Sequence, residues 1–270
     1  MVNIIKPNDL PEYSLVCMFS RLWVLKKWFE EFSKLEIDKE KTELIFYTDS
    51  LEPDLYKFVT IEAKKLTDFN GVRVIWGRNG ELTYRAKDSR IRICKIHEEL
   101  KKYIDGNKLI MIEDDTVVPP DGIIKLIRNF NMLENVAFVQ GIEVGRRAYR
   151  NYGSWQEAGA TVYTDPPRTG LYEINGGGFY CFITNAKLYK EHNFLSYQKT
   201  IYEPFGPDFY FVNKLTKKGY KAFTNWSIKC RHLYYLNGMI RSIDYSDANM
   251  QAIFIKKGET WQHETKPIKH

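Results

Sequence analysis

Three consecutive acids, Glu113, Asp114 and Asp115, carry the clearest chemical signal in this chain. They follow an apolar run at residues 109–112 and precede two prolines. Four apolar residues in a row predict a strand buried on both faces, so the acids should lie at its carboxyl end, where open α/β sheets bind ligands. Adjacent carboxylates repel one another, and oxygen ligands select Mg²⁺ or Mn²⁺ as the counter-charge. The pattern predicts a metal site for a phosphate-bearing substrate; the alternative is a wet loop in which Asp115 caps the next helix.

The elements around these acids alternate between strand and helix. We expect strands at residues 14–19, 43–48, 72–76 and 109–112, and helices at 22–32, 54–66 and 85–103. This order predicts an α/β fold with a mostly parallel, doubly wound sheet and right-handed crossovers. Farther along we expect helices at 123–130 and 209–218, strands at 136–140, 179–183 and 221–223, and a long loop at 141–173. Loops of that length are usually functional.

Composition limits the class of protein. The chain has 270 residues, 44% hydrophobic and 27% charged, which fits one large globular domain or two small ones with a substantial core. The net charge of +6 favours anionic ligands without specifying one. The four cysteines form no CxxC pair, and three of them, Cys17, Cys94 and Cys181, read as buried free thiols, which suggests a reducing compartment. No signal peptide or membrane-spanning run is visible, so we expect a cytoplasmic protein without a transmembrane segment.

Together these features resemble the nucleotide-sugar-dependent glycosyltransferases with the A-type fold, over residues 14–232. Glu113-Asp114-Asp115 matches the DxD motif of that family in the form EDD. The resemblance implies that Asp115 binds Mn²⁺ or Mg²⁺, with Glu113 as a further ligand, and that Asp114 contacts the sugar or ribose. His232 stands where many members place a metal-binding histidine after the last core strand. A lone histidine is also a common packing residue.

The catalytic base implied by the resemblance is Asp208. Inverting members carry an acid pair at the start of a helix like the one expected at 209–218. Pro207 stands where a glutamate is usual, so only Asp208 is carried over, with Glu203 as a substitute. The alternative for Asp208 is a plain helix cap, for which aspartate is favoured.

The donor-binding residues implied by the resemblance lie near the ends of the early strands and in a glycine run. An arginine on the helix before the acidic strand usually contacts base or phosphate, and Arg90 is chosen over Arg85 and Arg92. Together with Asp114, the donor-binding set is Phe19, Arg21, Asp49, Arg90, Gly177 and Gly178.

A basic loop interleaves cations with aromatic residues: Arg146, Arg147, Tyr149, Arg150 and Trp155. Such surfaces stack sugars or bases and attract phosphate. We expect it to contact the acceptor, together with Glu203, or to act as a lid.

The sequence thus predicts a single glycosyltransferase domain at 1–257, with a nucleotide-sugar half at 12–140 and an acceptor half at 141–257, then a polar tail at 258–270. The expected donor is a UDP-sugar and the expected reaction is inverting, with a retaining reaction as the rival. The acceptor would be a glycan, a lipid carrier, or a hydroxylated base in phage DNA. A sugar nucleotidyltransferase and a non-catalytic sugar- or nucleic-acid-binding module are the alternatives.

Overall fold

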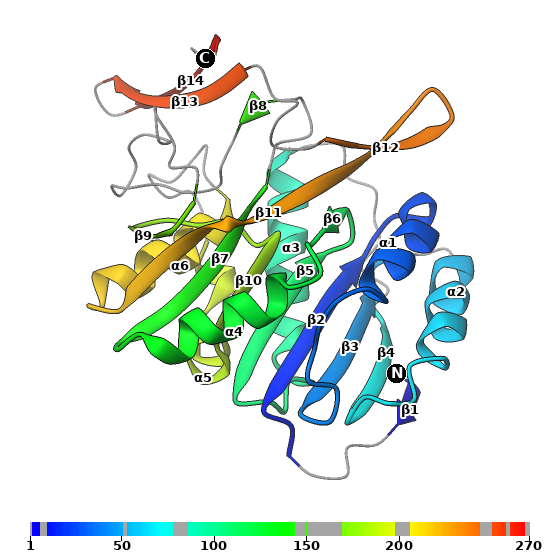
Figure 1. Ribbon diagram of the computed structural model, residues 1–270. Coiled ribbons are helices and arrows are strands. Elements are labelled where there is room, and N and C mark those ends of the chain that lie inside the picture. The colour runs from blue at the N-terminus through cyan, green and yellow to red at the C-terminus, as the bar shows by residue number, and fades with distance from the viewer. Residues whose placement is uncertain are drawn as a thin grey trace.

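The computed structural model describes residues 2–5, 10–50, 53–77, 86–143, 149–150, 169–197, 206–243, 250–257 and 260–267. An eleven-stranded sheet forms its centre, and three further strands form a small second sheet (Figure 1). Along the main path the strand order is β1-β4-β3-β2-β5-β10-β7-β11-β12, while β6 and β9 both pair with β11. The described helices are long enough to cover the sheet, but none is long and apolar enough to cross a bilayer.

The first half of the sheet has the expected parallel arrangement. It contains β2 (Tyr13–Phe19), β3 (Thr42–Thr48), β4 (Gly71–Trp76) and β5 (Lys108–Glu113). β2 lies between β3 and β5, and β4 lies outside β3, all parallel. An unexpected short strand, β1 (Val2–Ile5), adds to β4 in the antiparallel direction. Because the four parallel strands share a direction, their carboxyl ends meet at one edge.

The second half of the sheet is mixed, so the prediction of a mostly parallel sheet is wrong there. β10 (Cys181–Asn185) lies between β5 and β7 (Val136–Glu143) and is antiparallel to both. β11 (Lys221–Leu236) returns parallel to β7 and antiparallel to β9 (Leu171–Ile174). A run that is buried on both faces looks the same in either direction, so its side chains do not reveal the orientation.

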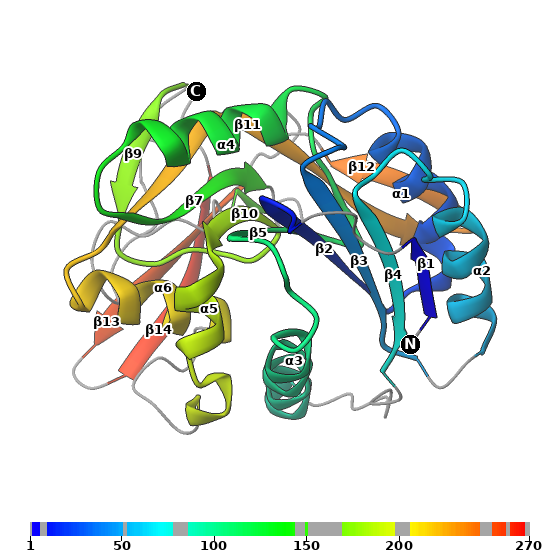
Figure 2. The same cartoon turned by 90° about the horizontal axis from the view of Figure 1, so that it is seen from below.

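Helices cover both faces of the sheet, as the doubly wound prediction requires (Figure 2). One face packs against α1 (Leu25–Phe32), α2 (Pro53–Ala63) and α4 (Gly122–Met132). The other packs against α3 (Ala86–Leu100), α5 (Ala186–Glu191) and α6 (Pro207–Lys217). In α1 the buried side chains are Leu25, Trp28, Phe29 and Phe32, the i, i+3, i+4, i+7 spacing of one helix face. The six-residue α5 is too short to show such a period, and the sequence does not predict it.

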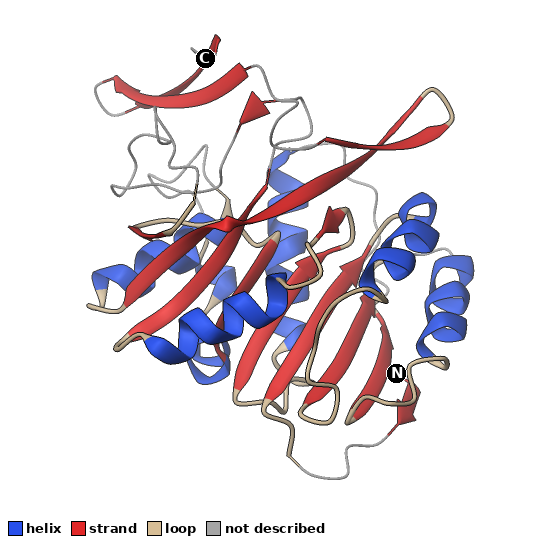
Figure 3. Cartoon of the chain, viewed as in Figure 1, coloured by secondary structure: helices blue, strands red, loops and turns tan. Residues whose placement is uncertain are grey.

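Two long hairpins also go beyond the sequence prediction (Figure 3). β11 runs 16 residues instead of the expected three, and its distal half pairs with β6 (Thr116–Val117) and β12 (Met239–Ile243). Asn237 and Gly238, with φ of 50° and 78°, make the turn into β12, the geometry that favours Asn-Gly in a tight hairpin. In the small sheet, β14 (Thr260–Pro267) pairs with β13 (Met250–Lys257), which pairs with β8 (Tyr149–Arg150). The segment expected to be a polar tail is therefore largely a strand, because backbone pairing holds it despite its polar side chains.

Candidate active site

Several of the predicted site residues follow or end the parallel strands at their carboxyl edge. Glu113 ends β5, Phe19 ends β2, and Asp49 directly follows β3. The crossover helix α3 and the helix α6 both begin at this edge, because each runs back against the strand that follows it. This topology places the start of α6, and with it Asp208, at the edge that carries the acids, although Asp208 is 93 positions after Asp115 in the sequence.

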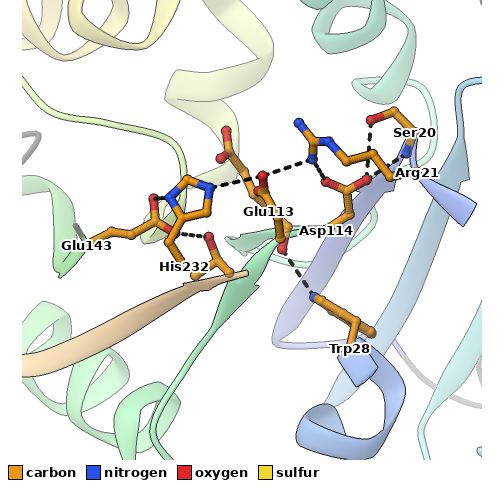
Figure 4. Close-up of polar contacts among 9 residues, drawn as sticks. Ser20, Arg21, Trp28, Glu113, Asp114, Glu143 and His232 are labelled. Atoms are coloured by element: carbon orange, nitrogen blue, oxygen red, sulfur yellow. Dashed lines mark hydrogen bonds and ion pairs between the residues drawn. The ribbon is translucent and has the colours of Figure 1, made fainter. Parts of the chain in front are cut away.

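Asp114 is held by the loop that follows β2. Its Oδ2 accepts hydrogen bonds from the backbone N–H of Ser20 at 2.8 Å and from the Ser20 hydroxyl at 3.2 Å. Its Oδ1 accepts from Nη1 of Arg21 (Figure 4). A buried carboxylate that is satisfied on both oxygens is fixed in orientation. Asp114 and Arg21, both predicted donor-binding residues, therefore form one unit.

Asp115 and His232 face one another in the interior of the site. Nε2 of His232 lies 3.0 Å from Oδ2 of Asp115, and both side chains are almost fully buried. The pairing of β6 with β11 sets this contact, because His232 is opposite Thr116 in that ladder. The backbone N–H of Leu233 also donates to the carbonyl of Asp115 at 2.7 Å. His232 is thus in the middle of β11, whereas the sequence placed it beyond the last core strand.

Glu143 completes the polar cluster, and the sequence analysis missed it. It ends β7, where its Oε2 lies 3.5 Å from Nδ1 of His232 and its Oε1 accepts from the Thr116 hydroxyl at 2.5 Å. Figure 4 shows the imidazole between Glu143 and the acidic segment. The available signal was an acid shortly after the apolar run at 136–140, near the edge that carries the EDD acids. A carboxylate on the second nitrogen is a common way to orient a metal-binding histidine.

The donor set fits a divalent cation. Asp114, Asp115 and Glu143 are buried carboxylates, and the contacts described above give them one arginine and one imidazole as counter-groups. The two ring nitrogens of His232 contact different acids, Nε2 with Asp115 at 3.0 Å and Nδ1 with Glu143 at 3.5 Å, so Nε2 could bind a cation together with Asp115 while Glu143 holds the other side of the ring. Within the described ranges, however, no three His, Cys, Asp or Glu side chains are placed to hold a metal. Glu113 therefore does not complete a set of three, and substrate oxygens would have to supply the remaining ligands.

Asp208 lies in the first turn of α6, beyond Gly206, which is the N-cap residue, and Pro207, the first helical residue. Burial raises the pKa of the Asp208 carboxyl from 3.8 to about 6, although the backbone N–H groups of Phe209 and Asp208 and the charge of Arg90 lower it. A base with a pKa near the working pH is well matched to proton abstraction. The role of Asp208 as the base stays a prediction.

The glycine run packs closely against aromatic side chains. A Cβ on Gly177 would lie 2.5 Å from Oε1 of Gln140, and a Cβ on Gly178 would lie 2.6 Å from the Tyr180 ring. The backbone N–H of Gly178 donates to the same Gln140 oxygen at 2.8 Å. That hypothetical Gly178 Cβ would also lie 3.7 Å from Oδ2 of Asp208. Packing alone thus requires glycine at both positions, and Gly178 lies directly beside the candidate base.

At the nucleotide end, Arg92 rather than Arg90 meets Asp49. Nε and Nη2 of Arg92 both contact Oδ2 of Asp49, and Nη2 donates to the Asp49 carbonyl at 3.1 Å. Burial raises the pKa of Asp49, while Arg92 opposes that rise. Arg90 instead donates to the Tyr197 hydroxyl at 3.4 Å, and its positive charge lowers the pKa of Asp208.

The Phe19 ring does not face the edge at all. It is fully buried and packs against Trp28, Phe29 and Phe46. Phe19 is therefore a packing residue, and the polar contacts of this loop with Asp114 come from Ser20 and Arg21.

Several predicted acceptor residues cannot be placed. Arg146, Arg147, Trp155 and Glu203 lie outside the described residues. Tyr149 begins β8, where it pairs with Met250 of β13.

Comparison with known proteins agrees with the fold. Neither a protein-family model nor a curated protein matches this chain. The solved mannosyltransferase PcManGT from Pyrobaculum calidifontis, in complex with GDP-Man and Mn²⁺, is similar with a TM-score of 0.53 and 12% identity, over 82% of this chain and 56% of that one. A197 from STIV is similar with a TM-score of 0.47 and 13% identity, over 87% of this chain and 91% of that one. The similarity to the mannosyltransferase shows that this chain has the fold of a glycosyltransferase.

Proposed function

We propose that this protein is a metal-dependent glycosyltransferase that moves a sugar from a nucleoside diphosphate to an acceptor hydroxyl. The observation that supports this most is the buried contact of 3.0 Å between Oδ2 of Asp115 and Nε2 of His232 at the carboxyl edge of β5. An imidazole nitrogen and a carboxylate oxygen are thus held together among further acids, and both are groups that a divalent cation takes as ligands. The shared fold with a mannosyltransferase supports the same reaction class.

Each group at the edge has a chemical role in this proposal. Asp115 and His232 would hold the metal, and Glu143 would orient the imidazole through Nδ1. When bound, the metal supplies positive charge to the leaving diphosphate. Asp208 takes the proton from the acceptor hydroxyl, since its carboxylate is ionised above pH about 6. Asp49, held by Arg92, would bind the ribose or base.

The test is a panel of UDP- and GDP-sugars, supplied with Mn²⁺ or Mg²⁺ and assayed for release of nucleoside diphosphate. UDP-sugars are included because of the family resemblance, and GDP-sugars because the mannosyltransferase binds GDP-Man. Release that requires metal and is lost in Asp115→Asn supports the proposal. Release of pyrophosphate from a nucleotide would instead indicate a nucleotidyltransferase, and binding without turnover would indicate a sugar-binding module.

The acceptor stays open among a glycan, a lipid carrier and a hydroxylated base in DNA. The basic loop and the net charge of +6 favour an anionic acceptor. Transfer of radiolabelled sugar to each acceptor class, measured with the donor that gives turnover, separates the three.

A further inference from the structure

Arg21 contacts both aspartates of the candidate cation site. Its Nη1 contacts Oδ1 of Asp114 and lies 3.1 Å from Oδ2 of Asp115. The latter oxygen is the one that Nε2 of His232 approaches at 3.0 Å. The side chain of Arg21 is 27% exposed, whereas those of Asp114 and Asp115 are 4% and 1% exposed. A partly exposed guanidinium thus contacts the buried carboxylate oxygen that would bind the metal.

Two adjacent buried carboxylates require a positive charge whether or not metal is bound. Without one, the repulsion and the lost hydration of Asp114 and Asp115 would disfavour the folded loop. Arg21 meets that need by bridging the pair. Once a divalent ion is bound at Asp115, a guanidinium nitrogen at 3.1 Å from the same oxygen would repel the ion.

We propose that Arg21 is a built-in counter-cation that contacts Asp115 until metal and nucleoside diphosphate arrive, and that it then leaves Asp115 to pair with the diphosphate. This inference rests on the proposed function. Asp114 would keep two hydrogen-bond donors if Arg21 moved away, because the backbone N–H and the hydroxyl of Ser20 both donate to its Oδ2. The guanidinium fork suits phosphate oxygens as well as it suits carboxylates.

The movement of Arg21 from Asp115 to the diphosphate couples the binding of the metal to the binding of the nucleoside diphosphate. A metal ion that binds alone must displace Arg21 from Asp115, and the guanidinium then keeps only its contact with Asp114, close to the bound ion. With nucleoside diphosphate present, the displaced guanidinium gains phosphate oxygens, so each ligand favours the other. The protein should therefore bind free metal weakly and bind metal together with diphosphate much more tightly.

The experiment measures Mn²⁺ binding to the full chain by the loss of the free Mn²⁺ electron paramagnetic resonance signal. Wild type and Arg21→Gln are titrated with Mn²⁺ alone, then with GDP or UDP, and protein-free nucleotide samples are subtracted because GDP and UDP bind Mn²⁺ themselves. Hydrogen bonds to charged groups are worth enough that Arg21→Gln should bind Mn²⁺ alone about tenfold to a hundredfold more tightly than wild type. The same variant should bind the nucleoside diphosphate more weakly at saturating Mn²⁺.

Two variants control for charge and shape. Arg231→Gln removes one positive charge next to His232 in sequence, but the guanidinium of Arg231 contacts Glu31 at 3.2 Å instead of the acidic pair. Because the ion pair between Arg231 and Glu31 is partly exposed, the Mn²⁺ affinity of Arg231→Gln should stay within about threefold of that of wild type. Arg21→Lys keeps the positive charge and should bind Mn²⁺ nearly as wild type does. Thermal melting confirms that each variant is folded.

The outcomes separate the inference from the function on which it rests. If Arg21→Gln binds Mn²⁺ no more tightly than wild type, or if Arg21→Lys tightens binding equally, the counter-cation role is wrong. Mn²⁺ binding by wild type with GDP or UDP would leave the proposed function standing in either case. If no variant and no wild-type sample binds Mn²⁺ with either diphosphate, the proposed function is itself overturned.

Discussion

Replacing Asp208 by asparagine should slow transfer while making the fold more stable. The burial that raises the pKa of Asp208 also destabilises its ionised form in the folded protein. The rise in its pKa from 3.8 to about 6 corresponds to about 3 kcal/mol between the protonated and ionised forms. Water still reaches part of this side chain, so we expect a stability gain of about 1–2 kcal/mol in Asp208→Asn above pH 7.

The pH dependence of this effect has a definite sign. The folded-state pKa of Asp208 lies above the unfolded value, so a bound proton stabilises the fold. That stabilisation is complete below pH about 4 and is lost as the pH rises through about 6. The difference between Asp208→Asn and wild type should therefore appear across this window and level off above it. Urea unfolding at pH 4, 6 and 8 measures it.

The kinetic side of the same experiment tests the base. Wild-type kcat/KM should rise as pH increases up to about 6 and then flatten, whereas Asp208→Asn should be slower by about 10²–10⁴-fold. A matched control is Asp54→Asn, which alters another acid in the first turn of a helix, one paired with Lys57 at 3.3 Å on the surface. If Asp208→Asn turns over normally and behaves like Asp54→Asn in urea, Asp208 is only a helix-terminal residue.

Three further predictions concern the metal and the acceptor. Chelation should abolish transfer and Mn²⁺ or Mg²⁺ should restore it, while Asp115→Asn should lose metal-dependent donor binding in calorimetry; full activity in excess chelator would contradict this. Glu143→Gln should keep the shape of the side chain but weaken the orientation of His232, so Mn²⁺ affinity should fall by about 10–100-fold in a spin-resonance titration, and an unchanged affinity would rule out the positioning role. If the acceptor is DNA, binding should weaken steeply with salt, and replacing the three arginines of the basic loop by glutamine should flatten that slope; no DNA binding at low salt would exclude this acceptor.

Local patterns in the sequence determined the first half of the fold and the position of the acids. Apolar runs and helical spacings gave β2 to β5 and the helices between them within a few residues, because each such element buries a face that its own residues define. A buried strand interior rejects charge, so Glu113, Asp114 and Asp115 could only lie at a strand end. The sequence likewise placed Asp208 at a helix start, and α6 begins one residue before it.

Tertiary structure alone decided the direction of β10, the length of β11 and the partners of the site residues. The pairing of β11 with β6 and β7 brings His232 to Asp115 and Glu143, although these residues are far apart in the chain. The sequence could not show that Arg92 instead of Arg90 meets Asp49, since both arginines are on one helix and differ only in the side that they face. Register and facing are set by long-range packing, in which a shift of one residue turns every side chain to the other face. The residue types therefore indicated the chemistry, and only the assembled sheet determined which groups meet.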